Sequence, residues 1–569
     1  MSRVVLICLR DDRRQADPAK LIRKLGTTLV PDDLLAPTPL ILTGSGLTIG
    51  IVNPNSSIRT RDTSVCLGAL VGAQEDWWQP GAAVPDGCFA LFRADGRCVE
   101  LVTDILASRT IWYAHTPELF VAATSQRAIV TVLGDFSPNP EAFSWMLATG
   151  TLGPGLSWDR RVRCLRGDTR LTLDRRTWTL TEDSAPVEFT PKKLSPKDHQ
   201  ENLRRAMEYV FEHLDLDYSR WPVLLSGGVD SRGVLLMLRG RADLKCITCG
   251  LRARQSDEHG DAYIAKLVAT DVKAQHRYFA TDVSYDATDQ LLRRFLVAGE
   301  GRIDQLPGFF VTSAFWRSLF DAGLPGVIRG DEALGFSRVV VSSQVLPAMR
   351  VFFLHDYRNL PDPRQWPLPP QTWPEFLRRR GGESPATWRD RLYQQVRIPY
   401  FLTGLADQTC GYLEVANPLL CRAIVAQIRT VPDSLRTRKV LFRRIVRSVG
   451  PRIPFARHRS EQHISGEVRR PQLVASISRE LDTDHARQLL SPQLVDFLLG
   501  NMPREPASKA AIRSLKLRSW RYLPDTLSRF IAHSVWRRNV DVNLLAFRAY
   551  IVSRMDGLLS HDASQQVKV

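Results

Sequence analysis

Short apolar runs separated by turn residues fill the first third of the chain. Between them stand Gly, Asp and Pro, and within them β-branched and aromatic residues are common. This pattern predicts the strands of a β-rich domain over residues 1–184. The runs are LTIGIV (47–52), CFALF (88–92), VELVTDI (99–105), IWYA (111–114), LFVAA (119–123), RLTL (170–173) and WTLT (178–181).

A different pattern begins after this region. Residues 185–195, APVEFTPKKLS, are polar and contain proline, as linkers do. Apolar residues at helical spacing follow from Pro196, and from Trp221 strand-like and helix-like segments alternate, which predicts a parallel α/β sheet. After about Tyr400 the pattern is mainly helical. We therefore expect four parts: the β-rich domain 1–184, the linker 185–195, an α/β domain over 196–460 and a helical C-terminal extension over 461–569.

Composition narrows the class of protein. The 569 residues are 44% hydrophobic and 24% charged, as in globular proteins, and they are too many for one core. No apolar run is long enough to cross a bilayer, and the N-terminus lacks the apolar segment and cleavage site of a signal peptide. We expect a cytoplasmic protein without a membrane partner.

Cysteine content and charge each leave an alternative open. Nine cysteines scattered over a long chain do not form a disulfide framework. Cys246 and Cys249 form a CxxC pair, but the segment LKCITCGL favours a buried strand over a metal or redox site. The net charge of +17 comes from widely spread arginine and favours solvated helix faces. The alternative is attraction to a polyanion or an acidic peptide.

The most specific motif is SGGVDS at residues 226–231, between the apolar run VLL and a helix-like segment. Gly227 and Gly228 let the backbone turn sharply and approach a phosphate, whose charge the helix N-terminus favours. Ser226 and Ser231 add hydroxyl donors. Asp230, an anion in an anion site, is expected to hold Mg²⁺ against the phosphates. An ordinary turn before a capped helix needs only one glycine and one capping residue, so it does not explain this motif. The motif is also not a Walker loop, because the spacing GxxxxGK[ST] is absent.

This motif resembles the signature of the ATP-pyrophosphatases, which cleave ATP between its α and β phosphates and include asparagine synthetases. The resemblance implies a parallel-sheet, adenine-nucleotide α-hydrolase-like synthetase domain that uses ATP and Mg²⁺. Residues 255–269, QSDEHGDAYIAKLVA, are similar to the SDE-and-helix segment of asparagine synthetases. By that resemblance the preceding strand end, Cys249 and Gly250, lies beside the adenosine. A helix start with favourable acidic residues is the alternative for this segment.

A second motif, VIRGDEALG at residues 327–335, resembles the family signature GxGxDExFGG. The resemblance makes Asp331 the other Mg²⁺ ligand and places Gly330 in the pyrophosphate turn. Arg329 stands near the position of the family's catalytic acid, so that position is empty or filled from elsewhere. Arg329 is a candidate for contacting phosphate or the reaction's oxyanion, and a surface ion pair is the alternative.

Residues 411–420, GYLEVANPLL, resemble the family stretch LExRxPFLD, and VPDSLRTRKVLFRRIV then resembles its Lys…LeuArg segment. The resemblance implies a catalytic role for Glu414, which in β-lactam-forming relatives orients a tyrosine. A buried helix-cap glutamate is the alternative. Those relatives use a later lysine, whereas Arg457 follows Ile453-Pro454 here. An arginine could stabilise a tetrahedral intermediate but could not act as an acid.

In the N-terminal domain, DGCFAL (86–91) and VTDILASR (102–109) resemble motifs of class II glutaminase domains. The resemblance implies an Ntn-like α+β sandwich, and we expect it to be degenerate. A working domain has Cys as residue 2, where this chain has Ser2, and the family's glutamine-binding runs have no match. Serine is a poor nucleophile without an activating base. The amine is therefore not expected to come from glutamine.

Enzymes with a lost glutaminase include β-lactam synthetases and lasso-peptide macrolactam cyclases. The Trp-, Pro- and Arg-rich stretch 358–386 suits a bulky substrate, although a surface loop is the alternative. We favour peptide cyclisation, in which an N-terminal amine attacks an adenylated Asp or Glu side chain and AMP and pyrophosphate are released. The expected partners are a precursor peptide, a leader-binding protein and a leader protease, with no nucleic acid. The alternatives are amidation of a small acid by free ammonia and, less favoured, tRNA modification.

Overall fold

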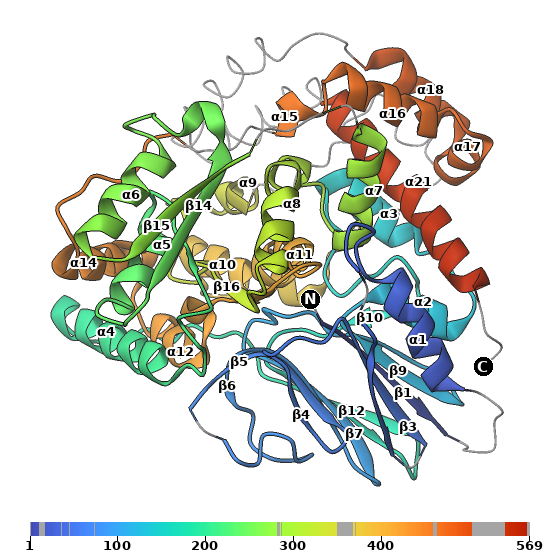
Figure 1. The fold of residues 1–569 in the computed structure, drawn as a ribbon, viewed down its shortest axis with the longest axis horizontal. Coiled ribbons are helices and arrows are strands. Elements are labelled where there is room, and N and C mark those ends of the chain that lie inside the picture. The colour runs from blue at the N-terminus through green and yellow to red at the C-terminus, as the bar shows by residue number, and fades with distance from the viewer. Residues whose placement is uncertain are drawn as a thin grey trace.

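The computed structural model joins an antiparallel sandwich to a parallel sheet flanked by helices (Figure 1). This is the mixed α/β architecture that the sequence predicts. No helix of the described residues is long and apolar enough to span a membrane. The structure describes residues 2–10, 17–35, 37–44, 46–72, 74–281, 285, 287–349, 368–369, 371–458, 464–502 and 541–565.

Two six-stranded antiparallel sheets face each other in the sandwich. Side chains alternate between faces, so Val4 and Leu6 of the first strand pack with Phe92 in a core between the sheets, while Val5 and Ile7 face the helices. In spatial order, one sheet contains β10 (Arg163–Cys164), β8 (Trp112–His115), β9 (Leu119–Ala123), β1 (Arg3–Leu9), β3 (Leu47–Val52) and β2 (Leu40–Gly44), and the other contains β12 (Thr179–Ser184), β11 (Thr169–Asp174), β7 (Cys98–Thr103), β6 (Asp86–Ala94), β5 (Ser64–Val71) and β4 (Arg59–Arg61).

Helices cover the outer face of the first sheet. The helix α1 (Pro18–Thr28) packs against β3, and α2 (Gln126–Leu133) packs against β8 and β9. The last helix, α21 (Val542–Ser564), lies against α2 and α3 (Pro140–Thr149) and is drawn in red in Figure 1. The C-terminal helix therefore closes over the N-terminal domain.

The alternating segments after Trp221 form a five-stranded sheet in which each neighbouring pair is parallel. Helices cover both faces, because Cys246 packs in the same core as Ile264, whereas the next residue, Ile247, packs with Phe315. The strands, in spatial order, are β15 (Gln275–Thr281), β14 (Lys245–Leu251), β13 (Val223–Leu224), β16 (Gly326–Ile328) and β17 (Glu414–Ala416), and the helices packed against them include α5 (Val229–Met237), α6 (Asp261–Asp271) and α8 (Leu306–Asp321).

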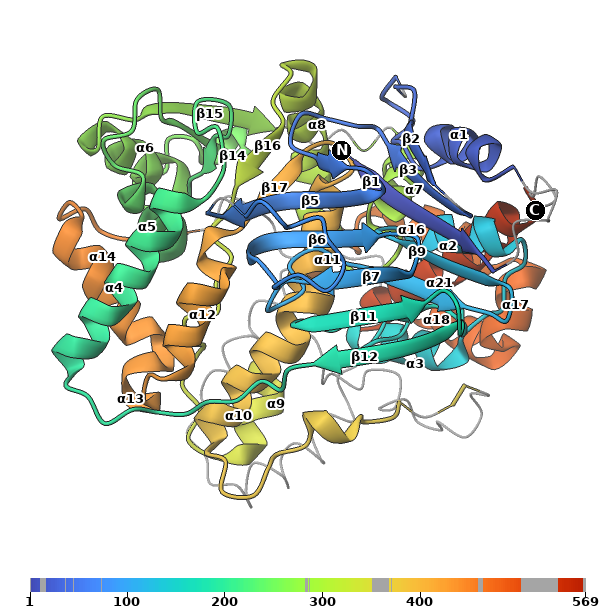
Figure 2. The same cartoon turned by 90° about the horizontal axis from the view of Figure 1, so that it is seen from below.

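The remaining elements are helical. The helix expected from Pro196 is α4 (Pro196–His213), whose first turn is capped by the Ser195 hydroxyl. It lies beside α12 and α14 (Figure 2). Residues 358–367 and 370 of the stretch 358–386 lie outside the described residues. The other α-helices are α7 (Thr288–Gly299), α9 (Val345–Met349), α10 (Pro385–Leu392), α11 (Thr403–Thr409), α12 (Arg422–Arg429), α13 (Asp433–Arg436), α14 (Val440–Val449), α15 (Ile464–Glu467), α16 (Pro471–Leu481), α17 (Asp484–Leu490) and α18 (Pro492–Asn501). The structure also contains the short helical turns η1 (Arg252–Arg254), η2 (Ser342–Gln344), η5 (Glu375–Leu377), η7 (Pro418–Leu420) and η8 (Thr437–Lys439), and the π-helix η6 (Tyr393–Leu402).

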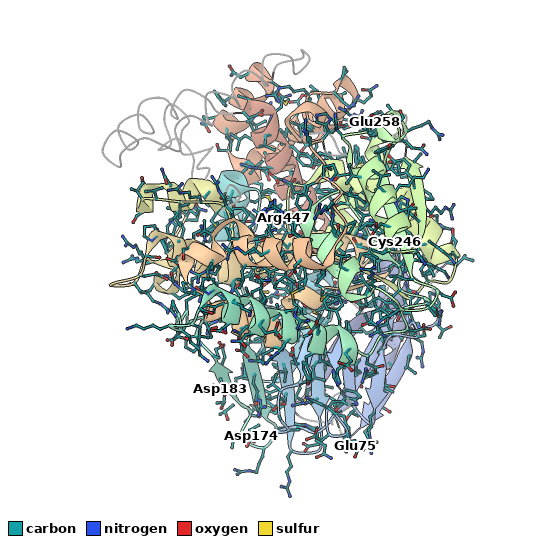
Figure 3. All side chains as sticks on the ribbon, turned by 90° about the vertical axis from the view of Figure 1, so that its left-hand side faces the viewer. Glu75, Asp174, Asp183, Cys246, Glu258 and Arg447 are labelled. Carbon is teal, nitrogen blue, oxygen red and sulfur yellow. The ribbon has the colours of Figure 1, made fainter. Side chains whose placement is uncertain are left out.

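The CxxC pair lies within β14. Cys246 is 1% exposed, and Figure 3 places it in the region of the parallel sheet. Burial raises the pKa of the Cys246 thiol to about 12, so it stays protonated and unreactive at neutral pH. The described residues contain no group of three or more His, Cys, Asp or Glu side chains suited to holding a metal. These observations favour the buried strand over the redox site.

Three residues of the sandwich's two motif segments, Asp86, Cys88 and Arg109, contact the parallel-sheet domain. Asp86 accepts hydrogen bonds from the backbone N–H groups of Arg422 (2.6 Å) and Ala423 (2.9 Å), at the start of α12. The Cys88 thiol donates to the Asn417 carbonyl at 2.9 Å, and Arg109 lies 3.2 Å from a carboxylate oxygen of the buried Glu414. The segments that resemble a glutaminase thus contribute to the contact between the two domains.

The Asp86→Ala variant is expected to lose about 1–2 kcal/mol of folding stability, because α12 has no capping side chain of its own. This corresponds to a fall in Tm of roughly 2–8 °C, measured by calorimetry. Asp183→Ala is the matched control, since Asp183 is an exposed carboxylate of the same domain. Equal Tm values for the Asp86 variant and the wild type would contradict the capping role.

Candidate active site

The turn of residues 226–231, which the sequence predicts to bind phosphate and which is called the phosphate-binding turn below, connects β13 to α5 at the carboxyl edge of the parallel sheet. The Ser226 and Ser231 hydroxyl oxygens are 2.9 Å apart, and Ser231 Oγ accepts from the Ser226 N–H at 2.9 Å. The Gly227 N–H donates to Asp261 Oδ1 at 3.1 Å, and the Gly228 N–H donates to Ser226 Oγ at 3.2 Å. These bonds close the turn, and the first N–H groups of α5 have no acceptor within the helix.

Two glycines are needed here for close approach. A Cβ atom on Gly227 would lie 2.4 Å from the Ala456 Cβ. A Cβ atom on Gly330 would lie 2.8 Å from the Ser231 backbone nitrogen and 3.0 Å from the Asp230 carbonyl carbon. The second turn, which carries Asp331, is therefore packed directly on the first. The structure brings together the two turns that the sequence assigns to pyrophosphate.

A lysine joins the carboxylates at this edge. Lys439 Nζ lies 2.7 Å from Asp230 Oδ2 and 2.7 Å from Glu332 Oε1. Burial lowers the pKa of Lys439, but attraction to Glu332 and Asp230 outweighs it and raises that pKa overall, so the lysine is charged. Burial also raises the pKa of Glu332 to about 7, against the attraction of Lys439. Lys439 adopts a left-handed backbone conformation, with φ of 57°, to reach these groups.

Asp331 forms an ion pair with Arg329 at 3.3 Å, and both side chains are partly buried. One buried carboxylate oxygen, Asp230 Oδ1, accepts no hydrogen bond within the described part of the chain, whereas the buried Asp331 Oδ2 lies against the Arg329 guanidinium. Uncompensated buried carboxylate oxygens are costly unless a cation or donor meets them. Hard cations bind through such oxygens, so this donor set fits Mg²⁺, with phosphate and water as its other ligands.

The other residues that the sequence predicts to lie near the nucleotide are found around the same edge. Cys249 and Gly250 are near the carboxyl end of β14, and the Gly250 carbonyl accepts from the Thr281 hydroxyl at 3.1 Å. Arg457 belongs to a segment held beside the phosphate-binding turn, because the preceding residue, Ala456, donates its N–H to the Gly227 carbonyl at 3.0 Å. The Arg457 N–H donates to the His259 carbonyl at 2.8 Å.

Glu414 lies apart from this group. Glu414 is the first residue of β17 and pairs with Gly326, the first residue of β16. The chain runs on to Asp331 from the other end of β16, where Ile328 pairs with Ala416. Glu414 is fully buried, and its charge faces Arg109 of the sandwich. The structure therefore does not bring Glu414 together with the phosphate-binding turn. The residue is buried, as the alternative expected, but it begins a strand and does not cap a helix.

Sequence reasoning missed four residues near the site: Glu332, Tyr393, Arg397 and Lys439. A signal existed for two of them. Glu332 follows Asp331 directly, and Lys439 stands in the KVLFRR segment that resembles the Lys…LeuArg run of the family. Tyr393 and Arg397 lie on η6, which carries no motif, so only the fold could place them here.

Of three comparisons with known proteins, one bears on this site. A glutamine phosphoribosylpyrophosphate amidotransferase from B. subtilis, complexed with ADP and GMP, aligns over 59% of this chain and 83% of its own, at 10% identity and a TM-score of 0.20. That score is too low to support an argument. A search of curated protein sequences gives no significant match. Residues 219–307 match the family model of asparagine synthase, and this match, which spans the phosphate-binding turn, supports the asparagine synthetase family and an ATP-dependent ligase.

Proposed function

We propose that the protein forms an amide through an acyl-adenylate. A carboxylate oxygen attacks the α-phosphorus of ATP, the bond to the β-phosphate breaks, and pyrophosphate leaves. An amine then attacks the acyl carbon, loses a proton, and expels AMP. The observation that carries this proposal is the pair of packed turns that carry Asp230 and Asp331, in which Asp230 keeps a buried oxygen without a donor and Asp331 is paired with Arg329.

Each residue of the site has a defined task in this reaction. Asp230 and Asp331 would hold Mg²⁺, which when bound neutralises phosphate charge and assists departure of pyrophosphate. The turn of residues 226–231 and the N-terminus of α5 bind the phosphates. Lys439 fixes the position of Asp230 and supplies positive charge beside the breaking bond. Cys249 and Gly250 border the adenosine, and Arg329 and Arg457 are the weaker candidates for stabilising the adenylate or the oxyanion.

The proposed substrate is a peptide that cyclises. Its own N-terminal amine would attack the adenylated side chain of an Asp or Glu, giving a macrolactam, and holding both groups in one site makes the step unimolecular. Ser2 supports an amine source other than glutamine, because it is fully buried and its hydroxyl donates to the Asn53 carbonyl at 2.9 Å. A leader protease and a leader-binding protein would deliver the precursor peptide in the cytoplasm.

The test is mass spectrometry of a cognate precursor incubated with its protease, ATP and this protein. We expect AMP, pyrophosphate and a peptide lighter by one water. Acetylation of the peptide's N-terminus should prevent the loss of water, and loss that survives acetylation would refute cyclisation. The second candidate is amidation of a small acid by free ammonia, which the asparagine synthase match favours. Conversion of aspartate and ammonia to asparagine would select it.

The Ser2→Ala variant is expected to keep its synthetase rate within about twofold, because the lost hydrogen bond contributes only about 1 kcal/mol to folding. Neither the wild type nor the variant should release glutamate from glutamine, as measured by an enzyme-coupled glutamate assay. Release of glutamate by the wild type and its loss in Ser2→Ala would show that the serine acts as a nucleophile.

A further inference from the structure

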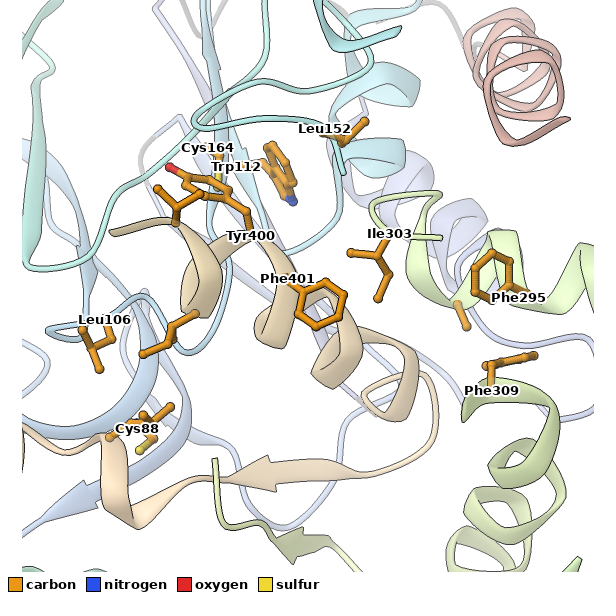
Figure 4. Close-up of a cluster of buried hydrophobic side chains, with 14 of the residues drawn as sticks. Cys88, Leu106, Trp112, Leu152, Cys164, Phe295, Ile303, Phe309, Tyr400 and Phe401 are labelled. Atoms are coloured by element: carbon orange, nitrogen blue, oxygen red, sulfur yellow. The ribbon is translucent and has the colours of Figure 1, made fainter. Parts of the chain in front are cut away.

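The helix η6 presents two polar side chains beside the nucleotide site. Tyr393 and Arg397 are four residues apart, and the Arg397 guanidinium lies 5.9 Å from the centroid of the Tyr393 ring. Their helix has π geometry along its ten residues, a rare conformation that is frequent at functional sites. Its other end is fixed in the apolar core, where Figure 4 shows Tyr400 and Phe401 near Trp112, Cys164 and Ile303. The position of Arg397 is therefore held by the fold.

Arg397 has uncharged partners within the described part of the chain. Its guanidinium lies 4.8 Å from the centroid of the Phe401 ring, 5.5 Å from that of Phe336 and 5.9 Å from that of Tyr393. One nitrogen donates to the Met349 carbonyl at 3.2 Å, and the buried Nε donates to no described atom. A guanidinium that is half-buried among aromatic rings and has no carboxylate partner binds a carboxylate strongly.

Arg397 lies near the turn that carries Asp331, as its aromatic neighbours and the nearby carboxylates indicate. The Tyr393 ring is 5.0 Å from that of Phe336, which follows the Asp331 turn and whose carbonyl accepts from the Arg438 N–H at 2.8 Å. Burial lowers the pKa of Arg397, and the charges of Glu332 and Asp331 act in the opposite direction without forming an ion pair. The pKa of Tyr393 is raised by burial and by Glu332, so its hydroxyl keeps its proton.

Two other cations of the site, Lys439 and Arg329, already bind carboxylates of the protein. Lys439 is bound by Asp230 and Glu332, and Arg329 is paired with Asp331. The nucleotide adds further negative charge there. A substrate carboxylate must approach the α-phosphorus against this charge, and it needs a cation of its own to do so.

We propose that Arg397 and Tyr393 form the subsite for the carboxylate that is to be adenylated, an assignment that rests on the proposed function. The guanidinium binds the carboxylate through parallel N–H···O bonds, and the Tyr393 hydroxyl donates a hydrogen bond to the same group. The rings of Phe336 and Phe401 pack on the methylene stem of that carboxylate. The expected ligand is an aspartate or glutamate side chain, carried either by a peptide or by the free amino acid.

The experiment is carboxylate-dependent exchange of pyrophosphate into ATP, with the precursor core peptide and free L-aspartate as the two probes. In Arg397→Gln, KM for the carboxylate probe should rise on the order of 100-fold, whereas KM for ATP should change less than about twofold. Arg397→Lys keeps the charge but loses the planar fork, and a rise of about tenfold is expected. Whichever probe supports exchange in the wild type identifies the source of the carboxylate.

Two further variants separate binding from other roles. Tyr393→Phe should raise KM for the carboxylate about five- to tenfold and leave kcat and its pH profile unchanged. Arg444→Gln, an exposed arginine of α14, is the matched control and should behave as wild type. If Arg397→Gln unfolds, the Lys and Phe variants carry the test.

The outcomes distinguish the two proposals. Unchanged KM for the carboxylate in Arg397→Gln and Arg397→Lys, with exchange intact, would overturn the subsite and leave the proposed function standing. An equal rise in KM for ATP would make Arg397 a nucleotide ligand and also overturn the subsite. Absence of exchange in the wild type with both probes would overturn the proposed function and the subsite with it.

Discussion

Asp230→Asn is expected to lower carboxylate-dependent pyrophosphate exchange by roughly a thousandfold, which corresponds to about 4 kcal/mol of transition-state stabilisation. The change removes one negative charge from the pair of carboxylates that would hold Mg²⁺, while the amide keeps the shape of the side chain. Lys439 retains its contact with Glu332, so the fold should persist. Exchange rates at saturating Mg²⁺ and ATP, with circular dichroism as the check on folding, provide the measurement.

Two companion variants make this test specific. Asp331→Asn should show the same loss, and the double variant should lose little more than either single one, because both residues serve one ion. Asp243→Asn is the matched control, an exposed aspartate in the turn after α5 whose φ of 56° suits asparagine. Wild-type exchange in either single site variant would remove the assignment of the metal ligands.

Lys439→Met is expected to cost about 3 kcal/mol of folding stability and to abolish most exchange activity. The substitution keeps the length of the side chain but leaves buried Glu332 and half-buried Asp230 without their shared cation. Without the attraction of Lys439, the pKa of Glu332 rises above its wild-type value of about 7. Urea unfolding of the variant and the wild type measures the stability difference.

The loss in Lys439→Met should depend on pH. A carboxyl group whose pKa is raised in the folded state contributes stability that is full below its unfolded pKa and is lost as pH rises through its folded pKa. The variant's deficit should therefore be larger at pH 8 than at pH 5.5, where Glu332 is protonated. Lys273→Met is the matched control, because Lys273 is exposed and shares the left-handed backbone, with φ of 59°. A deficit independent of pH would exclude Glu332 as its cause.

Local sequence patterns predicted the individual helices and strands better than they predicted which of these elements pack against each other. Alternating apolar runs identified strands such as β3 and β6, and the Ser195-Pro196 pair marked the start of α4, because pleat and capping are properties of adjacent residues. The pairing of α21 with α2 and α3 joins segments about four hundred residues apart in the chain, and no local pattern carries that information.

In the candidate site, too, the sequence predicted residues that stand in one motif but not residues that only the fold brings together. Ser226, Gly227 and Asp230 were found because a phosphate turn needs those residue types in consecutive positions. Glu414 was placed with them by resemblance, but its position at the start of β17 depends on strand register, which the motif does not encode. Arg397 reaches the site from a helix with no motif of its own.

The contacts of Asp86 and Cys88 also set an order of events during synthesis. Cys88 and its partner Asn417 are 329 residues apart, and Asp86 and Arg422 are 336 apart. A ribosome that adds roughly 5–20 residues per second needs on the order of 20–70 s to make that stretch. Throughout this interval the nascent sandwich exposes an unfinished face in which Arg109 still lacks Glu414. We therefore expect the newly made N-terminal half to bind ribosome-associated chaperones, and stalled or truncated chains to present that face to proteases.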